Sequence, residues 1–476
     1  MYIDGSWCDA ISGSRMEARS PIHDEVIGTV PEGGAKDVDL AMEAARGAQP
    51  QLEAMDIDQR AKMAMRVSDL IRASADELAQ VLTLDQGKPM YSEAVAEVER
   101  AADSWHQAGE VLQWTETHVY PIGSPDRRLI YTIRQAKGVY GMVTPFNVPI
   151  GLPQLYLPFC FVGGNAMVWC PAPTTSWCSL KFAEILEQAE LPAGAVNVVT
   201  GCGPVVGDAI MSHPGTDAIV FVGSNATGQI VAERAAGKPQ ILELGGNGPT
   251  IVLDDVDVEQ AASTIAMGCF KNAGQICTAT ERILSEPRIH KDLVEAMTQK
   301  AKSVCLGDPF ERSTTMGPLN NIGGVEKMDR HIADAVAKGA RLLLGGRNEP
   351  DLGSDMYYQP TVIDGFAIDS LLNQEETFGP MVKIRRCANE EETIQVADSC
   401  RYGLAAAVFT NDLDRAMRLS RRVKAGLVHI NENTCQWTPR MPAGGFTGAG
   451  SGIGRIGGKE TYRQMTNEKT VSISWL

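Results

Sequence analysis

The chain has 476 residues, of which 44% are hydrophobic and 21% charged, and this composition is typical of a globular protein with large cores. The length exceeds that of one ordinary domain and predicts about two to four. The net charge of −16 argues against nucleic acid and against an anionic membrane surface as partners.

Targeting and cross-linking signals are not visible in the sequence. No basic region followed by an apolar core opens the chain, and no uncharged apolar stretch of about 18 residues occurs, so we expect neither a secretory signal nor a membrane span. The 11 cysteines contain no Cys-x-x-Cys pair, which disfavours a zinc site and favours reduced thiols. We therefore expect a cytoplasmic protein that binds no metal.

Segments rich in β-branched residues alternate with helical patterns through the middle of the chain. Strands are expected at 139–143, 166–169, 196–199 and 218–222, and helices at 151–161, 176–188, 205–212 and 227–236. A second alternation has a strand from 251, a helix at 257–273, a strand near 281–285 and a helix at 288–303. Such alternation predicts two parallel sheets, each covered by helices on both faces.

Two strand-like segments, 127–134 and 469–476, lie outside this alternation. Strands so far from both sheets predict a small flap whose exposed edge recruits partners. The glycine-rich stretch 444–458 is expected to be a loop.

The cysteine at position 277 follows an Asn-x-Gly-Gln turn and precedes the run 278–281, which looks helical. A cysteine near the start of a helix has its thiolate stabilised by the helix dipole and by free amides. Most cysteines are buried structural thiols, but the tight turn favours a presented side chain. Cys277 is therefore a candidate nucleophile.

Two further side chains offer matching chemistry. Glu243 lies in an apolar run before two glycines, where burial would raise its pKa toward that of a useful general base. An exposed or salt-bridged Glu243 is an equally good interpretation. Asn147 stands at a strand-to-helix junction, where it can cap the helix or donate to an oxyanion. Together with Cys277, these groups are the parts needed to oxidise an aldehyde through a covalent thioester.

A turn at 223–228 closes one predicted strand and opens a helix. Its Gly-Ser start can present free amides to a phosphate, although it is not the Gly-x-Gly-x-x-Gly fingerprint. Alone, this turn is a weak signal, because glycines at such turns are usually structural.

Read together, these residues resemble the aldehyde dehydrogenase superfamily of the NAD(P)-dependent, non-acylating type, over almost the whole chain. The matching segments, in family order, are 37–41, 138–147, 164–165, 191–197, 221–228, 243–246, 375–380 and 407–411. The resemblance implies that Cys277 attacks the carbonyl, that Asn147 and the Cys277 amide hold the alkoxide, and that Glu243 activates water. It also implies a set of cofactor-binding residues: Thr144, Pro145, Phe146, Cys170, Gly203, Gly223, Ser224, Gly228, Glu376 and Phe378.

The resemblance further implies a fold of the α/β class. Two doubly wound parallel-sheet domains would be a Rossmann-like cofactor domain (1–117 and 137–245) and a catalytic domain (246–460). The flap (118–136 and 461–476) would serve oligomerisation, as a homodimer or homotetramer.

The sequence departs from the family pattern chiefly around the cofactor. Cys170-Pro171-Ala172-Pro173 stands where the family commonly has Lys-Pro-Ser-Glu. The lysine that would attract a 2′-phosphate and the glutamate that would repel it are therefore both absent. The choice between NAD and NADP stays open, with NAD slightly favoured. Asn247 replaces a frequent lysine, Phe146 replaces a frequent tryptophan, and the glycine-rich run at 444–452 is about two residues longer than usual.

The resemblance places the substrate pocket beside the helix after Asn147, around Cys277, and in a late loop. Its expected residues are Trp105, Leu152, Leu155, Tyr156, Ile276, Thr278 and Gln436, each of which is equally well explained by ordinary packing. The aldehyde itself is not identified. Two rival functions are a CoA-acylating dehydrogenase, which generally lacks the glutamate, and a non-catalytic binding protein that retains the fold.

Overall fold

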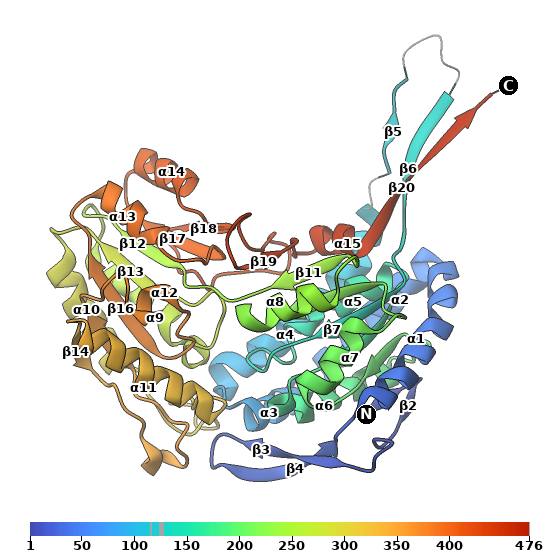
Figure 1. Cartoon of the computed structure of the whole chain (residues 1–476), viewed down its shortest axis with the longest axis horizontal. Helices are drawn as coiled ribbons and strands as arrows, with labels where there is room; N and C mark the ends of the chain where they lie inside the picture. The colour runs from blue at the N-terminus through green and yellow to red at the C-terminus, as the bar shows by residue number, and fades with distance from the viewer. Residues whose placement is uncertain (115–116, 123–127, 476) are drawn as a thin grey trace.

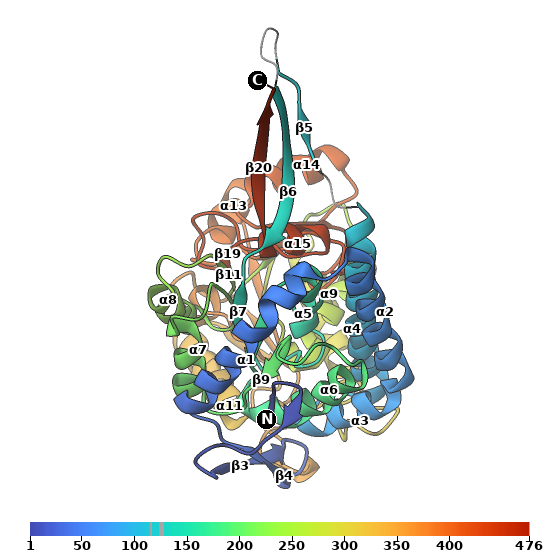
Figure 2. The ribbon, with the colours of Figure 1, turned by 90° about the vertical axis from the view of Figure 1, so that its right-hand side faces the viewer.

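The computed structural model describes residues 1–114, 117–122 and 128–475. Two large sheets lie side by side, and a narrow flap projects away from both (Figure 1). The C-terminal strand runs along this flap, away from both sheets, as the perpendicular view also shows (Figure 2). The fold is α/β, as predicted, with parallel pairing in the centre of each large sheet.

The first sheet has eight strands in the order β19-β11-β10-β7-β8-β9-β1-β2. Its five central strands are parallel and almost completely buried, because helices cover both faces. These strands are β7 (Val139–Val143), β8 (Ala166–Cys170), β9 (Val196–Val198), β10 (Ala218–Val222) and β11 (Gln240–Glu243). The associated helices are α1 (Ala35–Ala54), α2 (Ile57–Ala73), α3 (Ala75–Gln86), α4 (Val95–Val111), α5 (Leu157–Val162), α6 (Ser176–Gln188), α7 (Asp208–Ser212) and α8 (Asn225–Arg234).

Short antiparallel strands complete both edges of this sheet. They are β1 (Tyr2–Ile3), β2 (Ser6–Trp7) and β19 (Gly452–Ile453). Strand β19 corrects two expectations. The glycine-rich stretch 444–458 was expected to be a loop, and residues 246–460 were assigned to the catalytic domain. Gly452 pairs with Glu243 in the first sheet, so the late glycine-rich stretch returns to the predicted cofactor domain.

The second sheet has seven strands in the order β14-β15-β16-β13-β12-β17-β18, all parallel except the β14 edge. The strands are β12 (Pro249–Val252), β13 (Arg282–Ser285), β14 (Arg341–Leu344), β15 (Thr361–Asp364), β16 (Met381–Arg386), β17 (Ala405–Phe409) and β18 (Leu427–Ile430). The helices are α9 (Val258–Phe270), α10 (His290–Lys302), α11 (Ile322–Ala337), α12 (Leu371–Gln374), α13 (Glu390–Ala397) and α14 (Leu413–Arg422). Each sheet has its own buried apolar core.

The two orphan strands pair with each other, as predicted for a flap. β6 (Arg128–Ala136) runs antiparallel to β20 (Thr466–Ser474), and β5 (Val119–Tyr120) adds a third strand on the far side of β6. Helix α15 (Lys459–Met465) leads into β20. The ends of the two predicted strands, Arg127 and Leu476, lie outside the described residues. A separate hairpin is formed by β3 (Arg15–Ser20) and β4 (Glu25–Pro31).

The helix expected at 151–161 is divided in two. A short 3-10 turn (Pro153–Leu155) is followed by α5, which begins only at Leu157. Pro153 and Pro158 explain the break, because proline lacks the N–H of a helix interior and is accommodated in a first turn. Among the helices of the described residues, none combines the length and apolar character needed to cross a membrane.

Candidate active site

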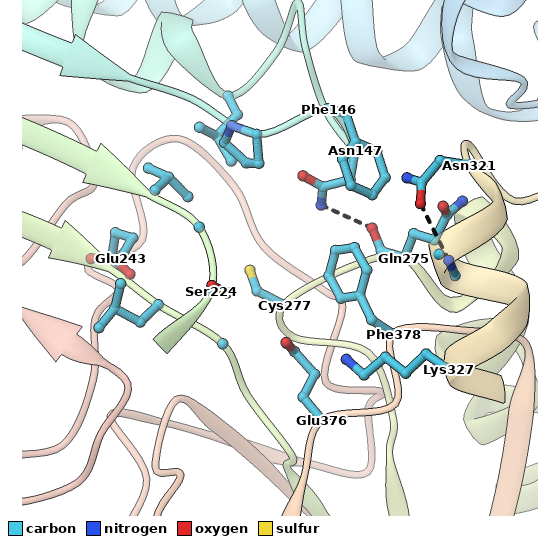
Figure 3. Close-up of a pocket in the computed structure, with 18 residues that line it drawn as sticks. Phe146, Asn147, Ser224, Glu243, Gln275, Cys277, Asn321, Lys327, Glu376 and Phe378 are labelled. Carbon is cyan, nitrogen blue, oxygen red and sulfur yellow. Dashed lines mark hydrogen bonds between the residues drawn. The ribbon is translucent and has the colours of Figure 1, made fainter. Parts of the chain in front are cut away.

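A cavity of about 280 Å³ lies where the two large sheets meet (Figure 3). Its walls come from the carboxyl ends of β7, β10 and β11 on one side and from the second sheet's connections on the other. The lining residues are Pro145, Phe146, Asn147, Leu152, Val222, Gly223, Ser224, Glu243, Leu244, Gly245, Gln275, Cys277, Asn321, Gly323, Gly324, Lys327, Glu376 and Phe378. The three predicted catalytic side chains therefore share one cavity.

A tight turn after α9 presents Cys277 to this cavity. Asn272 and Ala273 both adopt left-handed backbone conformations, with φ of 50° and 52°, and reverse the chain immediately after the helix. Gly246 packs directly on the turn, since a Cβ there would lie 2.2 Å from the Cys277 carbonyl oxygen. The Cys277 sulfur points into the cavity, as Figure 3 shows.

The structure corrects the expected environment of the thiol. No helix begins at Cys277; the chain passes through 278–281 without helical structure and enters β13. The N-terminal dipole that would stabilise a thiolate is therefore missing. Burial raises the pKa of Cys277, and the carboxyls of Glu376 and Glu243 raise it further. The resting group is a protonated thiol, which needs a base before it can attack.

Glu243 is the last residue of β11, and only 7% of its surface is exposed. Its Oε1 atom has no hydrogen-bond partner among the described residues. Burial raises the pKa of Glu243 to about 8, while the Arg455 guanidinium acts in the opposite direction. The carboxyl therefore becomes a carboxylate that can accept a proton as the pH rises through about 8, and the exposed or salt-bridged alternative is wrong.

Asn147 follows β7 and is 3% exposed. Its Nδ2 donates to the Gln275 carbonyl at 2.8 Å, which ties the amide to the turn that carries Cys277. An amide nitrogen has two hydrogens, so one N–H remains for an oxyanion. Asn147 caps no helix, because the segment that follows it is a turn.

Glu376 and Phe378 form the opposite wall. Phe378 has a left-handed backbone, with φ of 58°, and its ring stands edge-on to Phe146 with centroids 6.1 Å apart. Glu376 accepts a hydrogen bond from the Gly246 amide at 2.9 Å. Burial raises the pKa of Glu376 to about 7, whereas Lys327 lowers it. A Cβ at Gly245 would lie 2.7 Å from the Glu376 carboxylate, so a larger residue there would displace this carboxylate.

The residues present fit a dinucleotide. Ser224 follows β10 and caps α8, with its Oγ accepting from the Thr227 amide at 3.3 Å. The start of this ten-residue helix offers a positive dipole end to a phosphate. The unpartnered buried oxygen of Glu243 and the carboxyl of Glu376 face the same space, which suits a polar ligand with donor groups.

Four of the predicted cofactor residues do not line the cavity. Thr144 is buried and accepts from the Trp169 indole at 2.8 Å, and Gly228 packs against Leu244. Cys170 is 1% exposed, so its thiol faces the protein interior. Gly203 starts a π-helical turn (Gly203–Gly207) after β9.

The predicted substrate residues are scattered. Leu152 alone among them lines the cavity. Trp105 and Tyr156 are fully buried, and Leu155 packs against the first core. Ile276 and Thr278 flank Cys277 and are half-buried, while Gln436 lines a different cavity of about 670 Å³.

Helix α11 contributes a wall that the sequence did not reveal. Its capping residue Asn321, its first-turn glycines Gly323 and Gly324, and Lys327 all line the cavity. Asn321 is a typical capping residue and indicates where the helix starts, but no local pattern in the sequence predicts that this start faces Cys277. In Figure 3 the Lys327 amine points toward Glu376. Among the described residues, no group of three or more His, Cys, Asp or Glu side chains could hold a metal ion.

Comparison with known proteins gives matches over the whole chain. The model of the aldehyde dehydrogenase family matches residues 7–471. The chain is similar to a lactaldehyde dehydrogenase of Methanocaldococcus jannaschii, with 33% identity over 100% of both chains. An NAD-dependent aldehyde dehydrogenase from Sinorhizobium meliloti superposes with a TM-score of 0.96, at 34% identity, over 100% of this chain and 94% of its own. An NADP-dependent enzyme from E. coli also gives 0.96, at 32% identity, over 99% and 97%.

Proposed function

The chain belongs to the aldehyde dehydrogenase family, and from this premise we propose that Cys277, Glu243 and Asn147 carry out its reaction. It is an oxidoreductase that converts an aldehyde to the carboxylic acid with NAD or NADP. The convergence of these three side chains on one cavity carries the residue-level proposal.

The first step is activation of the thiol. Because the pKa of Cys277 is raised, its proton must pass to a base, and the Glu243 carboxylate lines the same cavity. The thiolate then attacks the carbonyl carbon, a C–S bond forms, and the carbonyl electron pair moves to oxygen. The remaining N–H of Asn147 and the backbone N–H of Cys277 stabilise that alkoxide.

The cofactor is held by the walls already described. When bound, NAD or NADP supplies the two-electron acceptor that turns the tetrahedral adduct into a thioester on Cys277. Ser224 and the start of α8 suit the pyrophosphate, and Glu376 suits the hydroxyls of a ribose. Phe378 and Lys327 complete this wall, with the lysine charge beside Glu376.

Hydrolysis completes the reaction. After it has released the Cys277 proton to solvent, Glu243, with a pKa of about 8, takes a proton from water as the water oxygen attacks the thioester carbonyl. The C–S bond breaks, the acid leaves, and the sulfur regains its proton. A CoA-acylating enzyme has no need of this base, so the buried carboxyl favours hydrolysis over transfer to CoA.

The test is absorbance at 340 nm with the purified protein. NAD and NADP are supplied in parallel with aliphatic aldehydes, aryl aldehydes and semialdehydes. Reduced cofactor should appear with at least one aldehyde, and the ratio of kcat/KM values gives the cofactor preference, with NAD expected to be the better. No turnover together with no cofactor binding by fluorescence quenching would contradict the assignment and favour a non-catalytic binding protein.

The flap supports a homo-oligomer, a dimer or tetramer. β20 forms one edge of its sheet, and an edge strand offers unpaired backbone groups to a second copy. Ile473 and Trp475, at its end, are 41% and 58% exposed. Ile473→Lys combined with Trp475→Lys should lower the mass measured by light scattering, and an unchanged mass would exclude this surface.

The unpaired cysteines favour a reducing compartment, and the proposed location is the cytoplasm.

A further inference from the structure

Two buried lysine–glutamate ion pairs flank the cavity. In the first, Lys88 bonds Glu97, with side chains 3% and 1% exposed. In the second, Lys383 bonds Glu281, with side chains 0% and 4% exposed. A buried ion pair is weak evidence for stability, because the cost of removing both charges from water offsets most of their attraction. The hydrogen bonds that these lysines and glutamates make to other residues indicate another role.

The first pair holds the segment that carries Asn147. Glu97 Oε1 accepts hydrogen bonds from the amides of Ile150 and Gly151 at 3.0 and 2.9 Å. Lys88 Nζ donates to the carbonyl oxygen of Asn147 at 2.8 Å. The pair thus fixes the start and the end of the segment 147–151, from which the Asn147 amide reaches the cavity.

The second pair holds the turn between Glu376 and Phe378. Glu281 accepts from the amide of Phe378 at 3.0 Å and from that of Thr377 at 3.4 Å. Lys383 Nζ donates to the Thr377 hydroxyl at 2.9 Å. Because Phe378 has an unfavourable left-handed backbone, the turn needs such external bonds to keep its shape.

Lys383 also explains a departure noted in the sequence. The aldehyde dehydrogenase family commonly has a lysine at the position of Asn247, directly after Glu-Leu-Gly-Gly. In this chain Lys383 reaches the same place from β16, with Nζ 3.3 Å from Asn247 Oδ1. Asn247 in turn donates to the Asn373 carbonyl at 2.8 Å. The positive charge is retained beside this segment, although a different strand supplies it.

We propose that the two pairs divide the positioning of the active site: Lys88–Glu97 sets the oxyanion donor Asn147, and Lys383–Glu281 sets the cofactor wall of Glu376 and Phe378. All four are positioning residues, since each acts through a backbone segment. The inference rests on the proposed function, because it presumes that Asn147 holds an alkoxide and that Glu376 contacts the cofactor.

The test replaces each pair by neutral side chains of similar size. Removing one partner would leave an unpaired buried charge, whereas neutralising both can leave the fold intact. The variants are Lys88→Met with Glu97→Gln, and Lys383→Met with Glu281→Gln. The matched control is the half-exposed pair remote from the cavity, Arg418→Met with Glu390→Gln. Circular dichroism and thermal unfolding confirm folding.

Three readouts separate the two roles without knowledge of the natural aldehyde. The first is the dissociation constants of NAD and NADP. The second is the acylation rate with p-nitrophenyl acetate, in which the Cys277 sulfur takes the acetyl group, p-nitrophenol leaves, and an oxyanion develops. The third is alkylation of Cys277 by iodoacetamide, which reports thiol access without an oxyanion.

The 88/97 variant should lower the acylation rate at least tenfold, with alkylation and cofactor binding within about twofold of the parent. The 383/281 variant should raise the cofactor dissociation constant at least fivefold, with acylation within about twofold. Equal effects of both variants on both readouts, or no effect of either, would overturn the division. If a variant fails to fold, Glu97→Asp or Glu281→Asp, which keeps the charge of the pair but shortens the side chain, is measured by the same criteria. A parent protein that neither binds cofactor nor accepts the acetyl group contradicts the proposed function instead.

Discussion

The part of the cavity that holds Cys277, Glu243 and Asn147 and the turn at 170–173 both include the carboxyl ends of first-sheet strands, yet they differ in how tightly they are constrained. At the reaction end, Cys277, Glu243 and Asn147 are held in one cavity by buried contacts. At the 170–173 turn, Cys170 faces the interior and Pro173 is exposed. An exposed residue such as Pro173 can be substituted without disturbing its surroundings, whereas side chains that react together must keep fixed positions relative to one another. The family pattern is accordingly kept at one end and lost at the other.

A second contrast concerns two buried carboxyls. Burial raises the pKa of Glu243 to about 8 and that of Asp85 to about 7. Each carboxyl has one buried oxygen without a hydrogen-bond partner among the described residues. Glu243 lines the cavity, whereas the other oxygen of Asp85 accepts a hydrogen bond from the Cys178 amide at 2.8 Å and so secures the first turn of α6. A raised pKa by itself does not mark a catalytic group; access to the reacting atoms does.

The largest effect is expected from Cys277→Ala. Loss of the nucleophile should reduce aldehyde oxidation by roughly a thousandfold or more, because no thioester can form. The dissociation constant for NAD or NADP should stay within about twofold, as measured by fluorescence quenching. If the turnover of the variant, followed at 340 nm, were close to that of the parent, Cys277 would not be the nucleophile, and the reaction end would tolerate substitution as the turn at 170–173 does.

Glu243→Gln should reduce steady-state turnover by roughly a hundredfold, since deacylation loses its base. In rapid mixing, a burst of reduced cofactor should persist at a lower rate, because thiol activation loses the same base but deacylation is slowed more. The carboxylate is the active form, so turnover of the parent should rise with pH through about 8 and then level off. A variant that retains this rising limb would show that another group is responsible.

A moderate effect is expected at the exposed turn. Pro173→Glu restores a negative charge, which should weaken NADP binding about fivefold relative to NAD, given a repulsion of about 1 kcal/mol in water. Pro173→Gln is the neutral control and should change the ratio of dissociation constants by less than about twofold. An unchanged ratio in the glutamate variant would place the 2′-phosphate away from this turn.

The smallest effect on activity is expected from Asp85→Asn. The folded pKa of Asp85 lies above its unfolded value of 3.8, so the folded state holds the proton more tightly. Its contribution to stability is complete below about pH 4 and declines by roughly 1.4 kcal/mol per pH unit up to about 7. Urea unfolding of parent and variant should differ by this slope, with kcat/KM unchanged. Parallel stability profiles would refute the assigned pKa shift.

The sequence by itself determined the α/β class, the alternation of strands and helices, and the three side chains proposed for the reaction. A strand or a helix shows itself in the spacing of apolar residues over about ten positions, so this periodicity reveals it. The pairing of β6 with β20 also followed, because two unassigned strands have few other partners. The tight turn before Cys277 was readable from Asn272 and Gly274.

Only the tertiary structure decided how distant segments meet. It replaced the expected helix after Cys277 by a turn and an irregular segment, returned β19 to the first sheet beside Glu243, and brought the start of α11 to the cavity. It also put Lys383 beside Asn247. Such contacts join residues that are tens to hundreds of positions apart. Local preference carries no information about them, because the packing of the two sheets sets which side chains become neighbours.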